Sequence, residues 1–416
     1  MGFSTLPGKV LGYSLVAAYA LAFVIFRATD VVEAYIEHGA LPVITSLGAV
    51  ALLARLIGVN VAIPMSAAAF AWYVDSRMLA PLGEDAKLPD GSIVIITGAN
   101  AGVGLATSQA LAQLGASVTL LLGCRSMAKC EAAAAEVRAE APGATVVPLV
   151  LDLASSRSIR SFASVAASHV PAEVRGELIL VNNGGFAPTT DSPPTADGLE
   201  AAMGAMHVGH HYLTRRLLVH EGLRARARAG VRVVNVASAM HHYCSLVLLA
   251  VEHKLVAAES APVCLAERML VDRPRPPSKA LEPYAEAKLS NVLHALELAR
   301  RMGGVEGGAP AVDAIAIDLG WVETSMQPFM TMTMKLSSLG LMRPADIGVR
   351  PVVLASLGMP GSPAPTPGVG RLVTPLGRLV REPLTFVRTE PQLAQLAEPL
   401  WTMSERLADE WDVAAA

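Results

Sequence analysis

Charged residues are scarce in this sequence. Of its 416 residues, 17% are charged and 52% are hydrophobic, whereas about 25% of a typical soluble protein is charged. The 33 basic and 36 acidic side chains give a formal net charge of −3, so the chain lacks the basic surface that neutralises phosphates. We therefore expect no nucleic-acid partner. A chain this apolar can bury a large core, which excludes general disorder.

Cysteine is scarce as well. None of the four cysteines belongs to a CxxC pair, so a cysteine zinc site is not expected. Four cysteines in 416 residues also fall short of a disulfide framework, and we predict reduced, mostly buried thiols. They are Cys124, Cys130, Cys244 and Cys264.

Metal-binding patterns are missing too, although histidine is frequent between residues 207 and 253. His210 and His211 adjoin on an expected helix and face different ways. No HExxH motif or carboxylate companion accompanies the histidines, so we expect no metal site. The histidines concerned are His207, His210, His211, His220, His241, His242 and His253.

Long apolar runs are concentrated in the first 89 residues. Residues 10–26, 39–54 and 56–74 carry no charge, and only Arg55 separates the last two runs. A membrane-spanning helix needs about 20 apolar residues, with a range of about 17–25. We therefore predict that residues 1–89 anchor the protein in a membrane through transmembrane helices, with Arg55 near an interface. A cleaved signal peptide at residues 1–26 and buried core helices are the alternatives.

From about residue 90, short apolar runs alternate with alanine-rich stretches of helical character. This alternation predicts an α/β fold with a doubly wound parallel (Rossmann) sheet over residues 90–416. Because the apolar runs are continuous, we expect a sheet that is buried on both faces. The predicted strands are residues 92–97, 117–122, 146–151, 178–181, 231–236 and 312–317, and two of the predicted helices are residues 105–114 and 128–139.

A glycine-rich turn joins the first predicted strand to the next helix. Gly98, Gly102 and Gly104 allow a tight turn and a close approach of a pyrophosphate to backbone N–H groups. The second predicted strand is followed by Arg125 and by no acidic residue. An acid there would bind the ribose of NAD, whereas arginine can pair with the 2′-phosphate of NADP. The pattern favours NADP, with a simply solvated Arg125 as the alternative.

Three further residues form a candidate catalytic group. Tyr284 and Lys288 are four positions apart, so on a helix they lie on one face, one turn from each other. We expect the ammonium to lower the pKa of the phenol, which makes Tyr284 a candidate general acid/base for an alcohol–ketone couple. Ser238 follows the predicted strand 231–236, where ligands bind in parallel sheets, and could orient the substrate oxygen.

Taken together, these motifs resemble the short-chain dehydrogenase/reductase family, most closely its retinol-dehydrogenase-like branch. The resemblance covers about four-fifths of the chain, in the family's order. The matching stretches are residues 97–104 (TGANAGVG), 123–126 (GCRS), 152–153 (DL), 182–185 (NNGG), 209–210 (GH), 233–238 (VVNVAS), 284–291 (YAEAKLSN) and 320–324 (GWVET).

The resemblance implies roles for the matched residues. Tyr284 would be the general acid/base, Lys288 would hold the nicotinamide ribose and tune Tyr284, and Ser238 would fix the reacting oxygen. Thr324 would contact the nicotinamide end of the cofactor. The implied cofactor-binding set is Gly98, Asn100, Ala101, Gly102, Val103, Gly104, Arg125, Asp152, Leu153, Asn182, Gly184, Tyr284, Lys288, Val322 and Thr324.

The sequence also departs from the family pattern. Met206 stands where the family usually has an asparagine that supports a proton relay, Leu319 stands where proline is common, and Ala287 replaces a frequent serine. Because Tyr284, Lys288 and Ser238 are intact, we interpret these changes as modulating. Met206 nevertheless supports an alternative, a non-enzymatic NADP-binding scaffold or sensor on the same fold.

An insertion at residues 243–281 separates Ser238 from Tyr284 by 46 positions, about twice the spacing of close relatives. It enters the chain beside the expected active site, so we predict a lid or a membrane-facing lip, with a surface loop of no function as the alternative. Protochlorophyllide reductases resemble this family and also carry an insertion there. Double-bond reduction is therefore a second alternative chemistry.

The main functional prediction is a membrane-attached oxidoreductase that transfers a hydride between NADP(H) and a lipophilic alcohol or carbonyl. Retinoid, steroid, prenol and fatty aldehyde substrates all fit, because a membrane anchor places the pocket where such molecules dissolve. The endoplasmic reticulum is the expected location, with plastid and mitochondrial envelopes as alternatives.

Overall fold

The computed structural model describes most of the chain from residue 82 onward. The apolar N-terminal runs, the insertion at 243–281 and Thr324 lie outside the described residues. Within the described part of the chain, no helix combines the length and apolar character needed to cross a membrane. The described residues are 82–83, 86–189, 191–238, 240–241, 282–305, 308–320, 322, 343–359, 370–373, 379–380 and 390–415.

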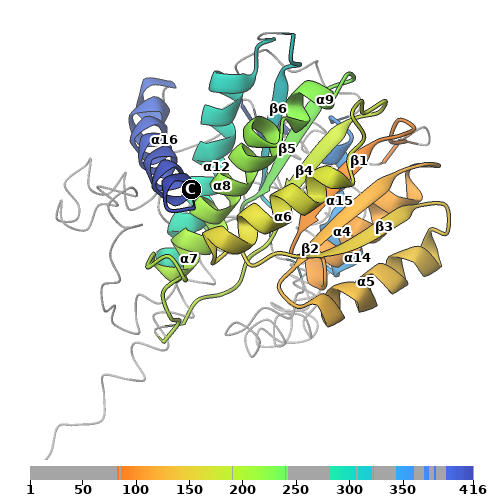
Figure 1. Cartoon of the computed structure of the whole chain (residues 1–416), viewed down its shortest axis with the longest axis horizontal. Coiled ribbons are helices and arrows are strands. Elements are labelled where there is room, and N and C mark those ends of the chain that lie inside the picture. Colours follow the sequence, from red (N-terminus) through yellow and green to blue (C-terminus); the bar gives the residue numbers. More distant parts are fainter. Residues whose placement is uncertain are drawn as a thin grey trace, which may run out of the picture. The chain divides into compact units, whose positions relative to one another are not determined.

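A single sheet forms the centre of this part of the chain (Figure 1). Among the described residues it has eight strands in the order β3-β2-β1-β4-β5-β6-β7-β8, and all neighbours are parallel except β7 and β8. The strands are β1 (Ile93–Thr97), β2 (Thr119–Cys124), β3 (Thr145–Val150), β4 (Leu178–Asn182), β5 (Val231–Val236), β6 (Val312–Ile317), β7 (Arg371–Val373) and β8 (Leu379–Val380).

This arrangement confirms the predicted doubly wound parallel sheet. The six predicted strands agree with β1–β6 to within two residues at each end, whereas the short β7 and β8 were not predicted. The strand order reverses between β1 and β4, because the chain moves outward from β1 to β3 and then returns to pair β4 with β1. Ligands of such sheets bind at this reversal, beyond the carboxyl ends of the strands.

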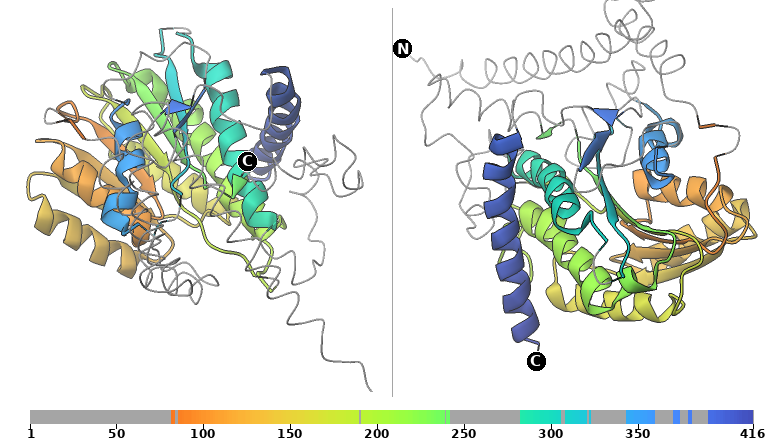
Figure 2. Two further views of the ribbon diagram at one scale, coloured as in Figure 1. Left: turned by 180° about the vertical axis from the view of Figure 1, so that it is seen from behind. Right: turned by 90° about the horizontal axis from the view of Figure 1, so that it is seen from above.

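Helices cover both faces of the sheet (Figures 1 and 2). One face carries α4 (Gly102–Gln113), α5 (Met127–Glu140), α14 (Ala345–Gly348) and α15 (Arg350–Ser356). The other face carries α6 (Ser156–Ser168), α12 (Glu282–Met302) and one irregular helical segment. That segment runs through α7 (Ala201–Met203), η1 (Gly204–Val208), α8 (Gly209–Arg215), η2 (Arg216–His220) and α9 (Leu223–Arg226), where η1 and η2 are π-helical turns.

Alternating residues of the central strands supply both hydrophobic cores. In β1, Ile93 and Ile95 pack into the core beneath α6 and α12, while Val94 and Ile96 pack into the core beneath α4 and α5. All four side chains are at most 3% exposed. Full burial of such a side chain stabilises the fold by about 1.5–3 kcal/mol. Two-sided burial explains why these strands read as continuous apolar runs in the sequence.

A long C-terminal helix, α16 (Glu390–Val413), lies outside this layer and packs against α12 and α8 (Figure 2). Its Leu400, Leu407 and Ala408 are buried against the same core as α12. The helix was not predicted from the sequence.

The cysteines depart from expectation at one pair. Cys124 ends β2 and Cys130 lies in the first turn of α5, and a disulfide joins them, with their Cα atoms 5.6 Å apart. Both side chains are buried, as predicted, but the prediction of reduced thiols is wrong for this pair. The turn after β2 folds α5 back over the strand and brings the two side chains together, which a count of cysteines cannot foresee. Cys244 and Cys264 lie outside the described residues.

A cluster of ion pairs links the strands at their amino ends, opposite the edge at which ligands bind. Arg232 of β5 lies 2.5 Å from Glu177, which precedes β4, and 3.0 Å from Asp313 of β6. Arg371 of β7 pairs with the same Asp313. Because the Arg232 side chain is only 11% exposed, solvent screens these pairs weakly.

We expect Arg232→Met to destabilise the protein. The substitution leaves the Glu177 carboxylate without its arginine, and breaking such a buried pair costs about 3 kcal/mol. The free energy of unfolding in urea measures this loss. Arg228→Met is the matched control, because its pair with Glu173 is 3.7 Å long and exposed on both sides. Equal stability losses in the two variants would contradict a structural role for the buried cluster.

Candidate active site

The glycine-rich turn between β1 and α4 has the backbone geometry that the sequence suggested. Gly98 has φ 65° and Gly102 has φ 54°, a left-handed conformation that side chains rarely adopt. A Cβ on Gly104 would lie 2.2 Å from the carbonyl oxygen of Gly98. Any larger residue at position 104 would therefore force the turn apart. The glycine-rich turn places the N-terminal end of α4 at the carboxyl edge of the sheet.

A hydroxyl that the sequence analysis did not single out holds this turn against the neighbouring strand. Thr97 Oγ1 accepts hydrogen bonds from the backbone N–H of Asn183, at 3.0 Å, and of Gly184, at 2.8 Å. It also lies 2.8 Å from Nε2 of His210, whose Nδ1 lies 2.8 Å from the Met206 carbonyl oxygen. Since that carbonyl can only accept, Nδ1 carries the proton and Nε2 accepts from Thr97. Burial lowers the pKa of His210 to about 4, which keeps the ring neutral.

Asn182, predicted to line the cofactor groove, is 1% exposed and lies among the strands. Its side-chain amide donates to Asn235 Oδ1 at 2.9 Å and to Thr214 Oγ1 at 3.1 Å. Asn235 in turn donates to the carbonyl oxygen of Asn291 in α12, at 3.1 Å. These bonds brace β4 and β5 against α12. They fix the position of the helix that carries Tyr284.

Tyr284, Lys288 and Ser238 come together at the carboxyl end of β5. The Ser238 hydroxyl lies close enough to the Tyr284 phenol to lower its pKa. The Lys288 ammonium lies 5.6 Å from the centroid of the Tyr284 ring and donates to the Val236 carbonyl oxygen at 2.8 Å. Tyr284 and Lys288 are 8% and 3% exposed. This is the group that can pass a proton to or from a bound oxygen.

The electrostatics of this group differ from expectation. Burial raises the pKa of Tyr284 to about 12; the Ser238 hydroxyl opposes that rise, and the carboxylate of Asp318 adds to it. The predicted lowering of the Tyr284 pKa by Lys288 is therefore wrong. The ammonium is directed at the Val236 carbonyl and the ring face, and not at the phenol oxygen. Burial also lowers the pKa of Lys288 itself to about 8.

Met206 lies beside this group, within the π-helical turn η1. Its side chain is fully buried. A Cβ on Gly185 would lie 3.1 Å from Met206 Sδ and 3.7 Å from Lys288 Nζ, so the thioether and the ammonium border the same space beside Gly185. An apolar group thus occupies the place at which the family resemblance implies an asparagine.

The remaining predicted cofactor residues lie along the carboxyl edge of the strands. Arg125 is exposed where β2 ends, and Asp152 is half-buried after β3, where its carboxylate accepts from the Ala154 N–H at 3.0 Å. Val322 is buried after β6 against Gly348. Asn100, Ala101, Gly102, Val103 and Gly104 form the turn and the start of α4, Leu153 follows Asp152, and Gly184 follows β4.

Metal ligands are not grouped in the part of the chain that the structure describes. No set of three or more histidine, cysteine or carboxylate side chains there could hold a metal ion.

Part of the chain is similar in sequence to known dehydrogenases. Residues 92–248 match the family model for short chain dehydrogenases. Human retinol dehydrogenase 12 is 36% identical over 218 residues, which cover 52% of this chain and 58% of the relative. Human retinol dehydrogenase 13 is 41% identical over 151 residues, 36% of this chain and 42% of the relative. The chain thus spans less than two thirds of these relatives.

A solved structure extends the likeness over more of the chain. An uncharacterized protein from Mycobacterium paratuberculosis matches with a TM-score of 0.51 and 28% identity, covering 78% of this chain and 97% of that one. Together with the sheet order and the ordered motifs, these matches show that the chain is similar to short-chain dehydrogenases/reductases, and to retinol dehydrogenases among them.

Proposed function

We propose that this protein is a membrane-attached, NADP-dependent oxidoreductase that interconverts a lipophilic alcohol and its carbonyl. The observation that carries the proposal is the convergence of Tyr284, Ser238 and Lys288 beside a glycine-rich turn, at one edge of the sheet. A tyrosine hydroxyl within reach of a serine hydroxyl suits a proton transfer to or from oxygen.

The residues at the carboxyl edge fit an NADP cofactor. Gly98 and Gly102 adopt the left-handed backbone of a turn that lets a pyrophosphate approach the start of α4, and a Cβ on Gly98 or Gly104 would collide with the backbone around that turn. Arg125 is exposed and supplies a cation for the 2′-phosphate. When bound, NADP(H) supplies or accepts the hydride. Asp152, Gly184, Val322 and Thr324 complete the proposed groove, while the buried Asn182 braces the strands beneath it. Lys288 is the proposed partner of the nicotinamide ribose.

The protonation states favour a proton donor in the reducing direction. With a pKa of about 12, Tyr284 holds its proton at neutral pH and can give it to a developing alkoxide. Ser238 orients the same oxygen through its hydroxyl. The Lys288 ammonium, which is held by the Val236 carbonyl oxygen, is left for the proposed contact with the nicotinamide ribose.

The relatives and the sequence support a lipophilic substrate. Several similar proteins are named retinol dehydrogenases, and the apolar runs of residues 1–89 suit a membrane anchor. Retinoid, steroid, prenol and fatty aldehyde substrates all belong to this proposal, with the endoplasmic reticulum as the proposed location. The insertion at 243–281 is proposed as a lid or lip over the site.

One observation favours a second candidate. Met206 places a thioether beside Lys288, where the family resemblance implies an asparagine, and a thioether is a poor partner for a water relay. A non-enzymatic NADP-binding scaffold or sensor would keep the fold and the cofactor groove while losing that relay.

We expect Tyr284→Phe to abolish turnover. Removing the hydroxyl removes the proton donor, so the rate of NADPH-dependent reduction of a lipophilic aldehyde should fall by roughly a thousandfold. NADPH oxidation by the full chain in detergent measures this rate. Tyr212→Phe is the matched control, because Tyr212 is buried but bonds Asp412 of α16 at 2.5 Å. Full activity in Tyr284→Phe would contradict the proposed role, and turnover in neither protein would favour the scaffold.

Arg125→Ala should change cofactor preference. Loss of a charge-assisted hydrogen bond, about 1.5–3 kcal/mol, should raise the Kd for NADPH by about tenfold to a hundredfold. The Kd for NADH should not change, since NADH has no 2′-phosphate. Fluorescence titration of both cofactors measures the effect, with Lys129→Ala as the control for an exposed cation on α5. A parallel loss of affinity for both cofactors would contradict recognition of the 2′-phosphate.

The pH dependence of reduction should report Lys288. Its pKa is lowered to about 8, so the side chain is a cation below that pH and loses its charge as the pH rises through it. We expect kcat/KM for reduction to decline above pH 8, whereas Tyr284, with a pKa of about 12, adds no inflection there. Lys288→Arg should be slower but flat across this range, because arginine stays charged. A decline that persists in Lys288→Arg would exclude Lys288 as its cause.

A further inference from the structure

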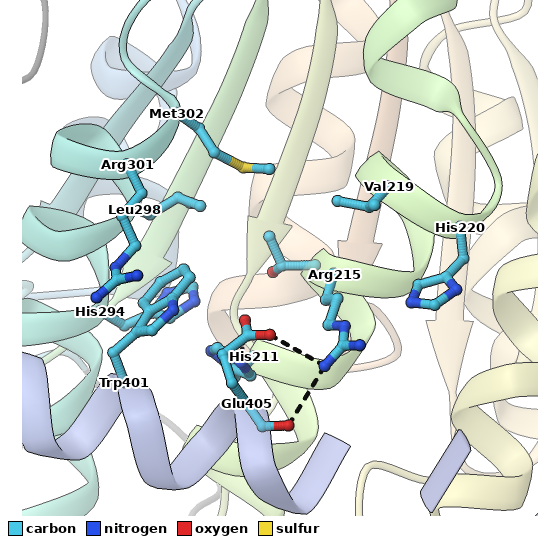
Figure 3. A pocket seen from close by; sticks show the side chains of 11 residues that line it. His211, Arg215, Val219, His220, His294, Leu298, Arg301, Met302, Trp401 and Glu405 are labelled. Carbon is cyan, nitrogen blue, oxygen red and sulfur yellow. Dashed lines mark hydrogen bonds and ion pairs between the residues drawn. The ribbon is translucent and has the colours of Figure 1, made fainter. Parts of the chain in front are cut away.

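A cavity lies on the outer side of α12, between α8, η2 and α16 (Figure 3). Its volume is about 500 Å³, within the range of small-molecule sites. The residues that α12 contributes to its lining, from His294 to Met302, lie in the half of the helix remote from Tyr284. None of them belongs to the proposed catalytic group or cofactor groove.

The cations around this cavity are already neutralised. Arg215 lies 3.0 Å from a Glu405 carboxylate oxygen and 2.5 Å from Asp409. Arg301 lies 2.5 Å from Glu297. Glu297 also pairs with Arg300, so the three arginines Arg215, Arg300 and Arg301 are balanced by the three carboxylates Glu297, Glu405 and Asp409. An anionic ligand would meet Glu405 inside the cavity. A neutral ligand suits this charge arrangement better.

A buried hydrogen-bond donor at the cavity lacks a partner. His294 is 4% exposed, and its Nδ1 lies 2.8 Å from the Asn235 side-chain amide nitrogen. That nitrogen can only donate, so Nδ1 of His294 must accept and the ring proton lies on Nε2. Nε2 has no hydrogen-bond partner among the described residues. A buried donor without a partner is unfavourable, and an acceptor atom of a ligand would satisfy it.

The neighbouring groups keep this donor neutral. Burial is the main cause that holds the pKa of His294 well below its usual value, and His211 and His207 lower it further. His211 is 1% exposed and lies 3.1 Å from Glu405 of α16, while its Nδ1 also lacks a partner. Trp401 of α16 stacks on the His294 ring with an interplanar angle of 13°. The imidazoles are thus held in place before any ligand arrives.

The remaining walls are aliphatic. Leu298 and Met302 of α12 face Val219 of η2 across the cavity (Figure 3). Both faces of the Trp401 ring are occupied, one by His294 and the other by the Arg301 guanidinium at 5.2 Å, so stacking of a further ring is blocked. We propose that this cavity is a second ligand site, for a neutral aliphatic molecule whose acceptor oxygen bonds Nε2 of His294.

Photolabelling tests the site. The probe is a medium-chain methyl ketone with a diazirine in its alkyl chain, applied to the full chain without cofactor, and labelled peptides are identified by mass spectrometry. We expect label on the peptides that contain Met302 and Glu405. The corresponding carboxylic acid probe should label them about fivefold less, the equivalent of about 1 kcal/mol. Label at the catalytic group would appear separately, on the peptide with Tyr284.

Two variants complete the test. Val219→Trp fills the cavity from a wall that is 53% exposed, and should cut this labelling at least about fivefold while leaving label at Tyr284 unchanged. Val305→Trp, at an exposed position outside the lining, should have no effect. Equal labelling in Val219→Trp and wild type, or a preference for the acid probe, would overturn the proposal. Because Tyr284→Phe leaves this cavity intact, the test is independent of the proposed oxidoreductase function.

Discussion

The hydrogen bonds of the Thr97 hydroxyl fix the point on which the site depends. They join the end of β1 to the backbone after β4, across the reversal of the strand order, and they connect through His210 to the turn that carries Met206. The hydroxyl accepts from two N–H groups and donates to a neutral imidazole, so all its hydrogen-bonding capacity is used in a buried place. The start of the glycine-rich turn is therefore held in place at the edge where a ligand would bind.

A second set of buried hydrogen bonds positions the other half of the site. Asn182 and Asn235 connect β4 and β5 to α12, and Lys288 donates to Val236 at the end of β5. Tyr284 is therefore placed by the contacts of its helix with the sheet. The same Asn235 amide also reaches His294, so the bracing network extends to the outer cavity under α16.

Much of this could be predicted from the sequence, because the signals are local. Continuous apolar runs predicted six of the strands. The glycine-rich turn, the pair Tyr284 and Lys288, and Ser238 could be identified because each depends on a short spacing or on the end of one strand. What could not be predicted depends on tertiary contact. The Cys124–Cys130 pair follows from the way α5 folds back, and the high pKa of Tyr284 follows from burial. The packing of α16 on α12 has no local signal in the sequence. Pro399 lies inside α16, and a proline normally argues against a helix at its position.

The central claim is that this site moves a hydride between NADP(H) and a lipophilic carbonyl while Tyr284 supplies the proton. Transfer of deuterium from NADPH deuterated at C4 to a lipophilic aldehyde such as retinal, followed by mass spectrometry of the product, tests it most directly. The account predicts one deuterium on the former carbonyl carbon and an exchangeable proton on its oxygen. Deuterium on a former double-bond carbon, or none in any product while NADPH still binds, would contradict it.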